Sequence, residues 1–289
     1  MNMILEVEPV PPKTRKMEAV KPTEKEEEIR SRIQAELLEL GISECPSEIL
    51  DRLVIFENLS KFNKDSRMIK IGVENILDDL SKKNKLELTP EQRHDVVFAS
   101  FISDIGKSSP LDDPMCQLAA IKLFSSSAGK LEDPTEVTVE ETLRTYLPKD
   151  AEVIISNLLK VGIIGDMTMR NFFDMHAFWT KSILDEHSQV FSKRVVEIAS
   201  SHHLVQGINP CGIKEAEIPD NLKYCIYLLM ALDKYQAKTE RGKATHPEAM
   251  RYLRGVFIEK YGDSPIMNSI IESIDELGKA GTLFSKTQK

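Results

Sequence analysis

The sequence predicts an all-α protein, and three observations support this expectation. Apolar residues recur at steps of three and four along most of the chain, which is the spacing of one helix face. Strict alternation of apolar and polar residues, which a half-buried strand requires, is almost absent. The composition, 41% hydrophobic and 29% charged, is that of an ordinary globular protein with a sizeable core. We therefore expect a bundle of about ten helices.

The first 22 residues differ from the rest of the chain. They combine four prolines with interspersed lysine and glutamate and little periodic hydrophobicity, so we expect a flexible leader. A helix is predicted from Thr23, which is a suitable cap, through a first turn rich in glutamate to a stop at Gly41.

The other predicted helices repeat this pattern. Their start signals include Thr89-Pro90, Pro148 and His246-Pro247, because proline suits a first helical turn whose N–H groups have no partner. The apolar periodicity marks residues 47–61, 66–83, 90–105, 113–125, 138–161, 168–186, 190–203, 219–236, 246–261 and 265–279.

No internal repeat or glycine-rich linker divides the chain, although 129–138 has the composition of a loop. The predicted organisation has four parts. They are a leader over 1–22, an N-terminal helical lobe over 23–110, an inserted connecting segment over 111–165, and a C-terminal helical lobe over 166–289.

Charge and cysteine content exclude several classes of protein. With 38 basic and 46 acidic residues the net charge is −8, which argues against a surface that coats DNA. The four cysteines are far apart and show no zinc-ligand spacing. We find no signal peptide and no run of about 18 apolar residues, so a cytoplasmic protein without a membrane span is expected. Phosphate-binding loops and nucleophile-elbow motifs are also missing from the sequence.

One motif that could carry chemistry is SDIGK, at the end of an apolar helix. Asp104 would supply an oxygen ligand and Lys107 a cation that suits phosphate, on either side of a glycine turn. The alternative is that Asp and Gly at this position only terminate the helix.

Histidines and a second aspartate could complete such a site. His202 and His203 end a helix, His176 lies in an earlier one, and Asp233 closes the apolar run YCIYLLMAL, where burial of a carboxylate is costly unless it is paired. Each of these residues could instead be structural or exposed. Together, Asp104, His176, His202, His203 and Asp233 form a mixed imidazole and carboxylate set of the kind that binds iron, manganese, nickel or zinc.

The order of these residues resembles the HD superfamily of metal-dependent phosphohydrolases, in particular the bacterial HD-GYP branch, whose members hydrolyse cyclic dinucleotides. SDIGK stands where that family writes HDIGK, and HH, GINP and the stretch LDKYQAKTERGK follow in the family's order. The resemblance covers about 66–275. It implies an HD-domain-like helical bundle with an insertion between the SDIGK helix and the helix of His176. It also implies metal ligands at Asp104, His176, His202, His203 and Asp233, and a phosphate contact at Lys107.

The sequence departs from the family at several positions. Ser103 replaces the first histidine of the HD pair, Lys64 or Asp65 stands where an earlier histidine is expected, and Asn209 replaces the tyrosine of Gly-Tyr-Pro. The literal dipeptide His94-Asp95 lies at the wrong end of its helix. The two missing imidazoles belong to one metal position, so the resemblance implies one bound metal ion rather than two.

Two functions remain open from the sequence. One is a non-catalytic or weakly active signalling or binding module that retains one metal position and binds a cyclic dinucleotide, another phosphodiester or a protein partner. The other is an active metal-dependent phosphodiesterase, for which the sequence alone assigns no catalytic residue.

Overall fold

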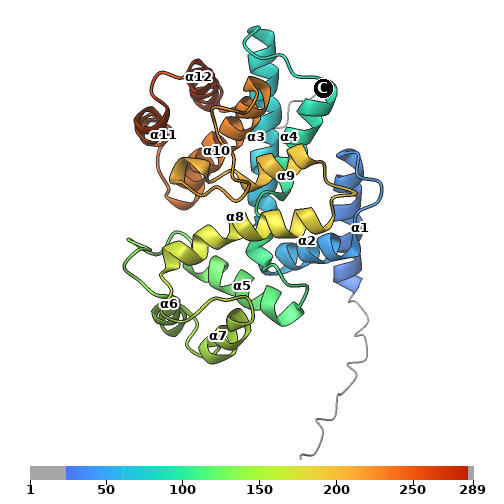
Figure 1. The fold of residues 1–289 in the computed structure, drawn as a ribbon, viewed down its shortest axis with the longest axis vertical. Helices are drawn as coiled ribbons and strands as arrows, with labels where there is room; N and C mark the ends of the chain where they lie inside the picture. The colour runs from blue at the N-terminus through green and yellow to red at the C-terminus, as the bar shows by residue number, and fades with distance from the viewer. Residues whose placement is uncertain (1–23, 61, 286–289) are drawn as a thin grey trace, which may run out of the picture.

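The computed structural model describes residues 24–60 and 62–285, and these residues form an all-α bundle (Figure 1). Within these ranges there are twelve α-helices, two short 3-10 turns (η1 and η2) and one π-helical turn (η3), with no strand beyond a single bridge between Thr138 and Thr168. The α-helices are α1 (Glu24–Glu39), α2 (Ser47–Leu59), α3 (Phe62–Lys82), α4 (Pro90–Ile102), α5 (Pro114–Ser127), α6 (Val139–Tyr146), α7 (Ala151–Leu159), α8 (Met169–Glu186), α9 (Lys193–Ser200), α10 (Asp220–Gln236), α11 (His246–Tyr261) and α12 (Pro265–Lys279). The all-α expectation is confirmed, whereas the predicted leader and the Thr23 cap lie outside the described residues.

The helix count of twelve in the described ranges exceeds the expected ten, partly because 138–161 is not one helix. α6 ends at Tyr146, and Leu147 leaves the helical region with φ −137° and ψ 49°. Leu147 precedes Pro148, whose ring clashes with a helical conformation of the residue before it. The proline that was read as a start signal therefore also separates α6 from α7.

Three threonines begin helices with a reciprocal capping box. Thr89, Thr138 and Thr245 each cap the start of a helix while the side chain three residues later bonds back to the threonine N–H. This arrangement satisfies two N–H groups that a helix start otherwise leaves without a partner. The first turns of α4, α6 and α11 are thus determined locally by sequence.

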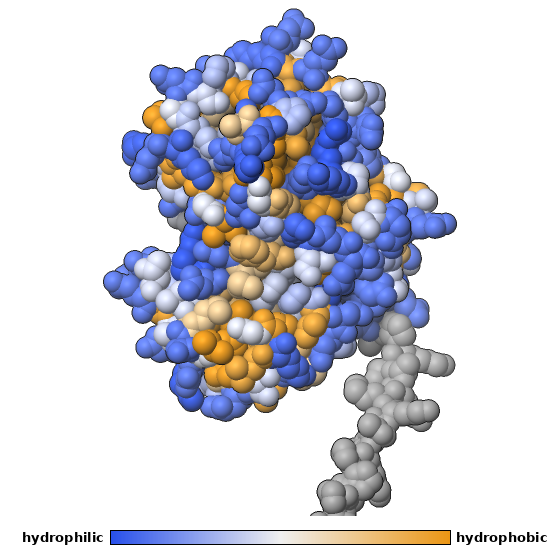
Figure 2. All heavy atoms as spheres, in the orientation of Figure 1, coloured by the Kyte–Doolittle hydropathy of each residue, from blue (hydrophilic) through white to orange (hydrophobic). Residues whose placement is uncertain are grey.

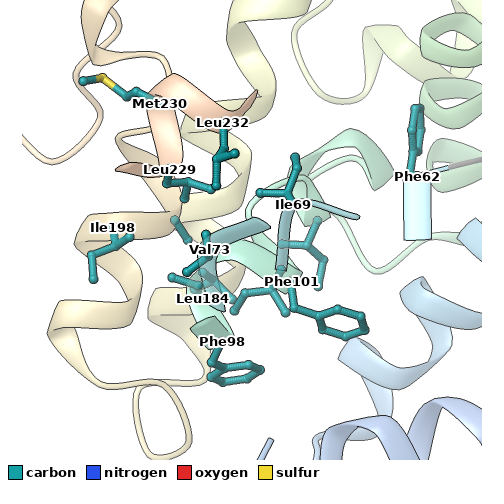
Figure 3. Close-up of a cluster of buried hydrophobic side chains, with 14 of the residues drawn as sticks. Phe62, Ile69, Val73, Phe98, Phe101, Leu184, Ile198, Leu229, Met230 and Leu232 are labelled. Carbon is teal, nitrogen blue, oxygen red and sulfur yellow. The ribbon is translucent and has the colours of Figure 1, made fainter. Parts of the chain in front are cut away.

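The core lies where α3, α4, α8, α9 and α10 meet (Figure 3). It includes fully buried aliphatic and aromatic side chains from all five helices, among them Val73, Phe98, Leu184, Ile198 and Leu229. Burial of each such side chain stabilises the fold by about 1.5–3 kcal/mol. This core joins helices from both predicted lobes, and it supports the ends of α4 and α9 and the middle of α8, which carry the candidate site.

The long helix α8 crosses the middle of the molecule (Figure 1). α5, α6 and α7 pack together on one side of it, and η1 and α9 pack against α8 itself. α10 packs on α3, α9 and α12, and α11 completes that part of the bundle. The segment 111–165 therefore contributes the α5–α7 group, while its status as an insertion and the exact domain boundaries stay predictions.

Apolar side chains reach the surface mainly over the segment 111–165. Figure 2 shows apolar atoms gathered over the part of the view where α5–α7 lie. Exposed large hydrophobic residues in this segment are Leu111, Met115, Val153, Leu159 and Ile164. Among the described helices, none has both the length and the apolar character needed to cross a membrane.

Candidate metal and anion site

The SDIGK motif places a carboxylate and an ammonium side by side where α4 ends. Asp104 precedes the 3-10 turn η1 (Ile105–Ser108), and its Oδ2 lies 2.6 Å from the Lys107 Nζ. Both side chains are buried, at 7% relative exposure each, and Lys107 also lies over the Phe62 ring at 4.8 Å. Burial, the largest single influence, opposes ionisation of Asp104, but Lys107 and the neighbouring His176 and His202 together lower the pKa of the carboxyl. The pair is therefore a buried, ionised ion pair.

A buried arginine holds the backbone that follows Lys107. Arg52 of α2 donates from one terminal nitrogen to the Ser108 carbonyl (3.2 Å), the Ser108 hydroxyl (2.8 Å) and the Ser109 carbonyl (2.6 Å). Ser109 has φ 73°, a conformation that a non-glycine residue rarely adopts. The guanidinium, which is a planar multiple donor, thus stabilises a strained turn directly after the motif.

η1 approaches the backbone of α8 very closely at Gly106. A Cβ added there would lie 2.0 Å from the His176 carbonyl oxygen and 2.5 Å from the Thr180 nitrogen. Thr180 joins the two segments, because its hydroxyl donates to the Ser103 carbonyl (2.9 Å) and accepts from the Gly106 N–H (3.1 Å). Glycine at this position is what allows Asp104 to reach the histidine of α8.

His176 from α8 and His202 just beyond α9 face one another through their Nε2 atoms, which are 3.0 Å apart. The Nδ1 atom of His176 bonds to the Phe173 carbonyl, and that of His202 bonds to the Ala199 carbonyl at 2.6 Å. A carbonyl oxygen only accepts hydrogen bonds, so each Nδ1 carries the hydrogen and each neutral ring leaves Nε2 bare. Two nitrogen lone pairs therefore point at one another.

Asp104 adds a third acceptor to this pair. Its Oδ1 lies 3.5 Å from the His176 Nε2 and 3.8 Å from the His202 Nε2. Burial, followed by the charge of Lys107, lowers the pKa of His176 to about 3, and burial also lowers that of His202. A proton between the rings is thus disfavoured near neutral pH. Converging acceptors without a hydrogen between them form an arrangement that a cation stabilises.

The spacing of the two nitrogens suits a metal ion. Ligand nitrogens at about 2.0–2.1 Å from one ion lie about 2.9 Å apart at a right angle and about 3.3 Å apart at the tetrahedral angle. The observed 3.0 Å between the Nε2 atoms of His176 and His202 falls within this interval. Hydrogen bonds from the opposite ring nitrogens to carbonyl groups are also what orients histidine ligands in metalloproteins.

His203 completes a three-histidine group that could hold a metal ion. Each of His176, His202 and His203 offers one ring nitrogen, and these three atoms lie within 4.8 Å of one another. The His203 ring contacts the His176 ring edge-to-face at 4.7 Å between centroids. Neighbouring helical residues point about 100° apart, and the two histidines converge here because the chain leaves α9 at Ser200 before reaching them.

Asp233 and Lys234 of α10 approach His203 from the other side. The Lys234 ammonium donates to the Asp233 Oδ2 at 2.9 Å and lies 3.2 Å from the His203 Nδ1. That ring nitrogen donates to the Gln206 Oε1, because an amide oxygen only accepts hydrogen bonds. Burial, the largest single influence, opposes ionisation of Asp233, but Lys234, the two neighbouring histidines and Arg241 together hold the pKa of Asp233 well below its usual value. Asp233 and Lys234 therefore form a second buried ion pair.

A cavity of about 330 Å³ opens onto this group of side chains. Lys107, His176, His203, Asp233 and Lys234 form part of its wall. Further lining residues supply three more cations and several apolar or aromatic surfaces, namely Arg170, Lys238, Arg241, Phe62, Phe124, Phe173 and Tyr252. Five basic side chains around one cavity make it suitable for an anion.

The five residues predicted as metal ligands lie in the same part of the structure, but their contacts differ. Three histidines form the group just described, and Asp104 lies beside two of them. Asp233 contacts Lys234 and lines the cavity. Coordination by either carboxylate stays a prediction.

The structure also shows the surroundings of the residues at which the sequence departs from the HD-GYP pattern. Ser103 is buried and its hydroxyl donates to the Ser100 carbonyl at 3.4 Å. Asp65 is half-buried and lies in the electrostatic field of Arg241, Lys107 and Asp104, whereas Lys64 is exposed. Asp65 is therefore the residue that faces the site from α3.

Asn209 and the literal His-Asp dipeptide have other contacts. The Asn209 side chain closes the 209–213 loop through two 2.8 Å hydrogen bonds with Ile213. His94 bonds to the Leu40 carbonyl at 2.6 Å, and Asp95 faces Arg194 at 3.5 Å. The literal His94-Asp95 pair thus makes contacts unrelated to the cavity.

Sequence reasoning did not single out Lys234 or Arg170. A lysine directly after an aspartate at the end of an apolar run could have signalled a buried ion pair, because an unpaired buried lysine is rare. Arg170 lies near the start of α8 and pairs with Asp174 one turn later at 3.3 Å, a pattern that is common on exposed helices.

Comparisons with known proteins do not add to this description, since no family model, no curated protein and no solved structure matches the chain.

Proposed function

We propose that this protein is a metal-holding module that binds a phosphate-bearing small molecule, of the cyclic dinucleotide or related phosphodiester class, in the cavity beside the three histidines. The observation that carries the proposal is the direct contact between a convergent imidazole group and a cavity lined by five basic side chains. The order of SDIGK, HH and LDKYQAKTERGK, which resembles the HD-GYP branch of the HD superfamily, supports the same class of ligand.

The residues present fit a single divalent transition-metal ion. His176, His202 and His203 would supply nitrogen ligands and Asp104 an adjacent oxygen, a donor set that suits iron, manganese, nickel or zinc. When bound, such an ion supplies Lewis-acid stabilisation of phosphate oxygens. The rings of His176 and His202 are already oriented by hydrogen bonds to the carbonyl groups of Phe173 and Ala199.

The protein's own side chains would bind and orient the ligand. Arg170, Lys238 and Arg241 line the cavity and can donate charge-assisted hydrogen bonds to phosphate oxygens. Phe62, Phe173 and Tyr252 supply apolar walls against which sugar or base surfaces can pack. Such a mixture of apolar wall and few cations is typical of small-molecule sites.

We infer a binding or signalling role, with at most weak hydrolysis, from the residues at the second metal position. Ser103 and Asp65 stand where the resemblance expects two imidazoles, and Ser103 bonds to a backbone carbonyl. Two-metal phosphodiesterases stabilise the attacking and leaving oxygens with separate ions. A chain with ligands for one ion retains binding but loses that arrangement.

Metal analysis followed by ligand binding tests the proposal. Protein purified without chelator should contain up to one transition-metal ion per chain, and His202→Ala should contain none. Calorimetry with cyclic di-GMP and cyclic di-AMP should then detect binding that Arg241→Met weakens at least tenfold. Lys214→Met is a suitable control, because Lys214 is an exposed residue paired with Glu217.

Turnover distinguishes the binding module from the alternative phosphodiesterase. Absence of metal and of nucleotide binding in every preparation would contradict the proposal. Robust manganese- or iron-dependent hydrolysis that Asp104→Ala abolishes would instead establish the active enzyme.

A further inference from the structure

Each of the three histidines has its Nδ1 atom held by a hydrogen-bond acceptor, but the acceptor of His203 is of a different kind. Backbone carbonyls three residues earlier in the chain accept from His176 and His202. The His203 Nδ1 donates instead to the side-chain Oε1 of Gln206, three residues later. One of the three ring orientations therefore depends on a side chain that can be replaced.

The 3-10 turn η2 (Leu204–Gln206) brings Gln206 to the His203 ring. Side chains three residues apart lie above one another in such a turn, and the Gln206 N–H donates to the His203 carbonyl at 2.9 Å. Leu204 is buried and anchors the turn, and Gly207 ends it with φ 86°. The local sequence thus places an amide beside an imidazole.

The Gln206 oxygen decides which nitrogen of His203 is bare. Because Nδ1 carries the hydrogen that this oxygen accepts, the neutral ring offers its lone pair at Nε2. The Lys234 ammonium lies 3.2 Å from the same Nδ1, but it has only donor hydrogens and its acceptor is the Asp233 carboxylate at 2.9 Å. Of these two neighbours, Gln206 is the one that favours a bare Nε2. It gives His203 the arrangement that orients histidine ligands in metalloproteins.

The same glutamine lines the cavity. Gln206 is exposed and belongs to the cavity wall together with Lys107, Lys238 and Arg241. Since its oxygen accepts from His203, its amide nitrogen keeps two N–H groups, for which the described part of the chain provides no acceptor. Donation from such groups to an anionic phosphate oxygen is charge-assisted and therefore strong. One side chain is thus placed to contact a metal ligand and a bound phosphate.

We propose that Gln206 is a positioning residue that holds His203 in its metal-binding tautomer and donates its amide N–H groups to a phosphate oxygen of the ligand. The inference rests on the proposed metal and phosphate site, to which it adds a neutral donor. The role requires an acceptor and a donor on one side chain. Glutamate keeps only the acceptor, and methionine keeps neither of the two.

The tautomer of His203 tests the positioning role without any metal. ¹⁵N NMR of the metal-free protein at neutral pH distinguishes a protonated Nδ1 from a protonated Nε2, and comparison with His203→Gln assigns the signals. We expect a protonated Nδ1 in the wild type and in Gln206→Glu, whose carboxylate still accepts. In Gln206→Met the donor Lys234 remains beside Nδ1, so the hydrogen should move to Nε2. A protonated Nε2 in the wild type, or a protonated Nδ1 in Gln206→Met, would overturn the role.

Calorimetry with Ni²⁺ and, separately, with inorganic phosphate tests both ends of the amide. Gln206→Met should lower the Ni²⁺ affinity at least about tenfold, the usual effect of removing the partner that orients a ligand. Gln206→Glu should keep the Ni²⁺ affinity at or above the wild-type value, because its carboxylate also accepts from Nδ1. Both variants lack the amide donor, so each should lower the phosphate affinity about tenfold, as expected for the loss of a hydrogen bond to a charged group.

Gln189→Met is the matched control. Gln189 is an exposed glutamine between α8 and α9 that lines a different cavity, so this variant should keep both affinities. Gln206 is exposed as well, and its replacements should fold, which circular dichroism checks. Wild-type Ni²⁺ affinity in Gln206→Met, or wild-type phosphate affinity in both Gln206 variants, would overturn the role of Gln206 while leaving the metal site intact. Absence of Ni²⁺ binding in every protein, the wild type included, would overturn the proposed metal site and this role with it.

Discussion

Two polar clusters that contain histidine adjoin α10, and they differ in what the histidine ring nitrogens contact. His246, at the start of α11, has a partner for each nitrogen, since the Tyr235 hydroxyl lies 2.8 Å from Nδ1 and the Asp275 carboxylate lies 3.0 Å from Nε2. In the cluster of His176 and His202 the Nε2 atoms face each other at 3.0 Å. Adjacent residues of one helix, Lys234 and Tyr235, thus serve two clusters of different character.

The difference separates a stabilising network from a binding site. Around His246 donors and acceptors alternate, and Asp275 is further balanced by Arg254 at 3.1 Å and Lys279 at 2.9 Å. Such a network is already satisfied and gains nothing from an ion. Around His176 and His202 acceptors converge without donors between them, so an added cation lowers the free energy of that region.

The largest expected effect is on the close approach of η1 to the α8 backbone, beside the cluster of His176 and His202. Gly106→Ala would force a Cβ to within 2.0 Å of the His176 carbonyl oxygen, an atom that cannot move independently of α8. We expect the free energy of unfolding to fall by more than about 3 kcal/mol, beyond the usual cost of overpacking. Urea unfolding followed by circular dichroism measures this change.

Gly255→Ala is the matched control for that substitution. An added Cβ at Gly255 meets nothing within 4 Å, and alanine favours the helix interior by about 0.5–1 kcal/mol over glycine. This variant should be at least as stable as the wild type. A Gly106→Ala protein with the wild-type urea midpoint would show that η1 is not held against α8.

The next prediction compares how much Ni²⁺ affinity is lost when a histidine is removed from each cluster. His202→Ala should lower the Ni²⁺ affinity by more than about 100-fold, because loss of a ligand costs more than loss of the partner that orients it. His246→Ala should leave the Ni²⁺ affinity within about twofold while lowering the free energy of unfolding by about 1–2 kcal/mol through its lost hydrogen bonds. Equal losses of affinity in the two variants would contradict the distinction between the clusters.

Much of this distinction was predictable from sequence, and part of it was not. The all-α fold followed from periodicity, and the order of Asp104, His176, His202 and His203 pointed to residues that the structure brings together. Periodicity is carried by neighbouring positions, and the order of the motifs can be read along the chain. Both were therefore readable without tertiary information.

The parts that sequence reasoning missed depend on contacts between distant elements. Lys234 looked like an ordinary charge at the end of a helix until its ammonium was found between Asp233 and His203. The choice between Lys64 and Asp65 required the orientation of α3, which decides which neighbour faces inward. Pro148 was interpreted as a helix start signal, but the break that it makes in 138–161 became evident only from the conformation of Leu147.

The third prediction is that acid destabilises the metal-free protein through the cluster of His176, His202 and His203. The pKa of His176 is lowered to about 3 from the usual 6.5, and those of His202 and His203 are also lowered, first of all by burial. The unfolded chain therefore binds more protons than the folded one below pH 6.5. Stability should be fully present above this pH and should be lost as the pH falls, by up to about 1.4 kcal/mol per pH unit for each histidine.

Urea midpoints between pH 7 and pH 5 measure this slope, in a range where carboxylates stay ionised. His203→Gln should reduce the slope, because glutamine can still donate a hydrogen bond, as the His203 Nδ1 does to Gln206, but does not titrate. A free energy of unfolding that rises on acidification would contradict the assignment of neutral, buried imidazoles. Bound Ni²⁺ should steepen the loss, since protons then also displace the ion.

The smallest expected effect is on the His246 cluster, in which both ring nitrogens already have hydrogen-bond partners. Tyr235→Phe removes the hydroxyl that bonds to the His246 Nδ1 while keeping the buried ring, so only one hydrogen bond is lost. We expect a decrease of about 1 kcal/mol in the free energy of unfolding. Because the Tyr235 hydroxyl contacts His246 and not the histidines that converge, the Ni²⁺ affinity should stay at the wild-type value. A change in the Ni²⁺ affinity on Tyr235→Phe, measured by calorimetry, would show that the two faces of α10 are energetically linked and that the two clusters act as one.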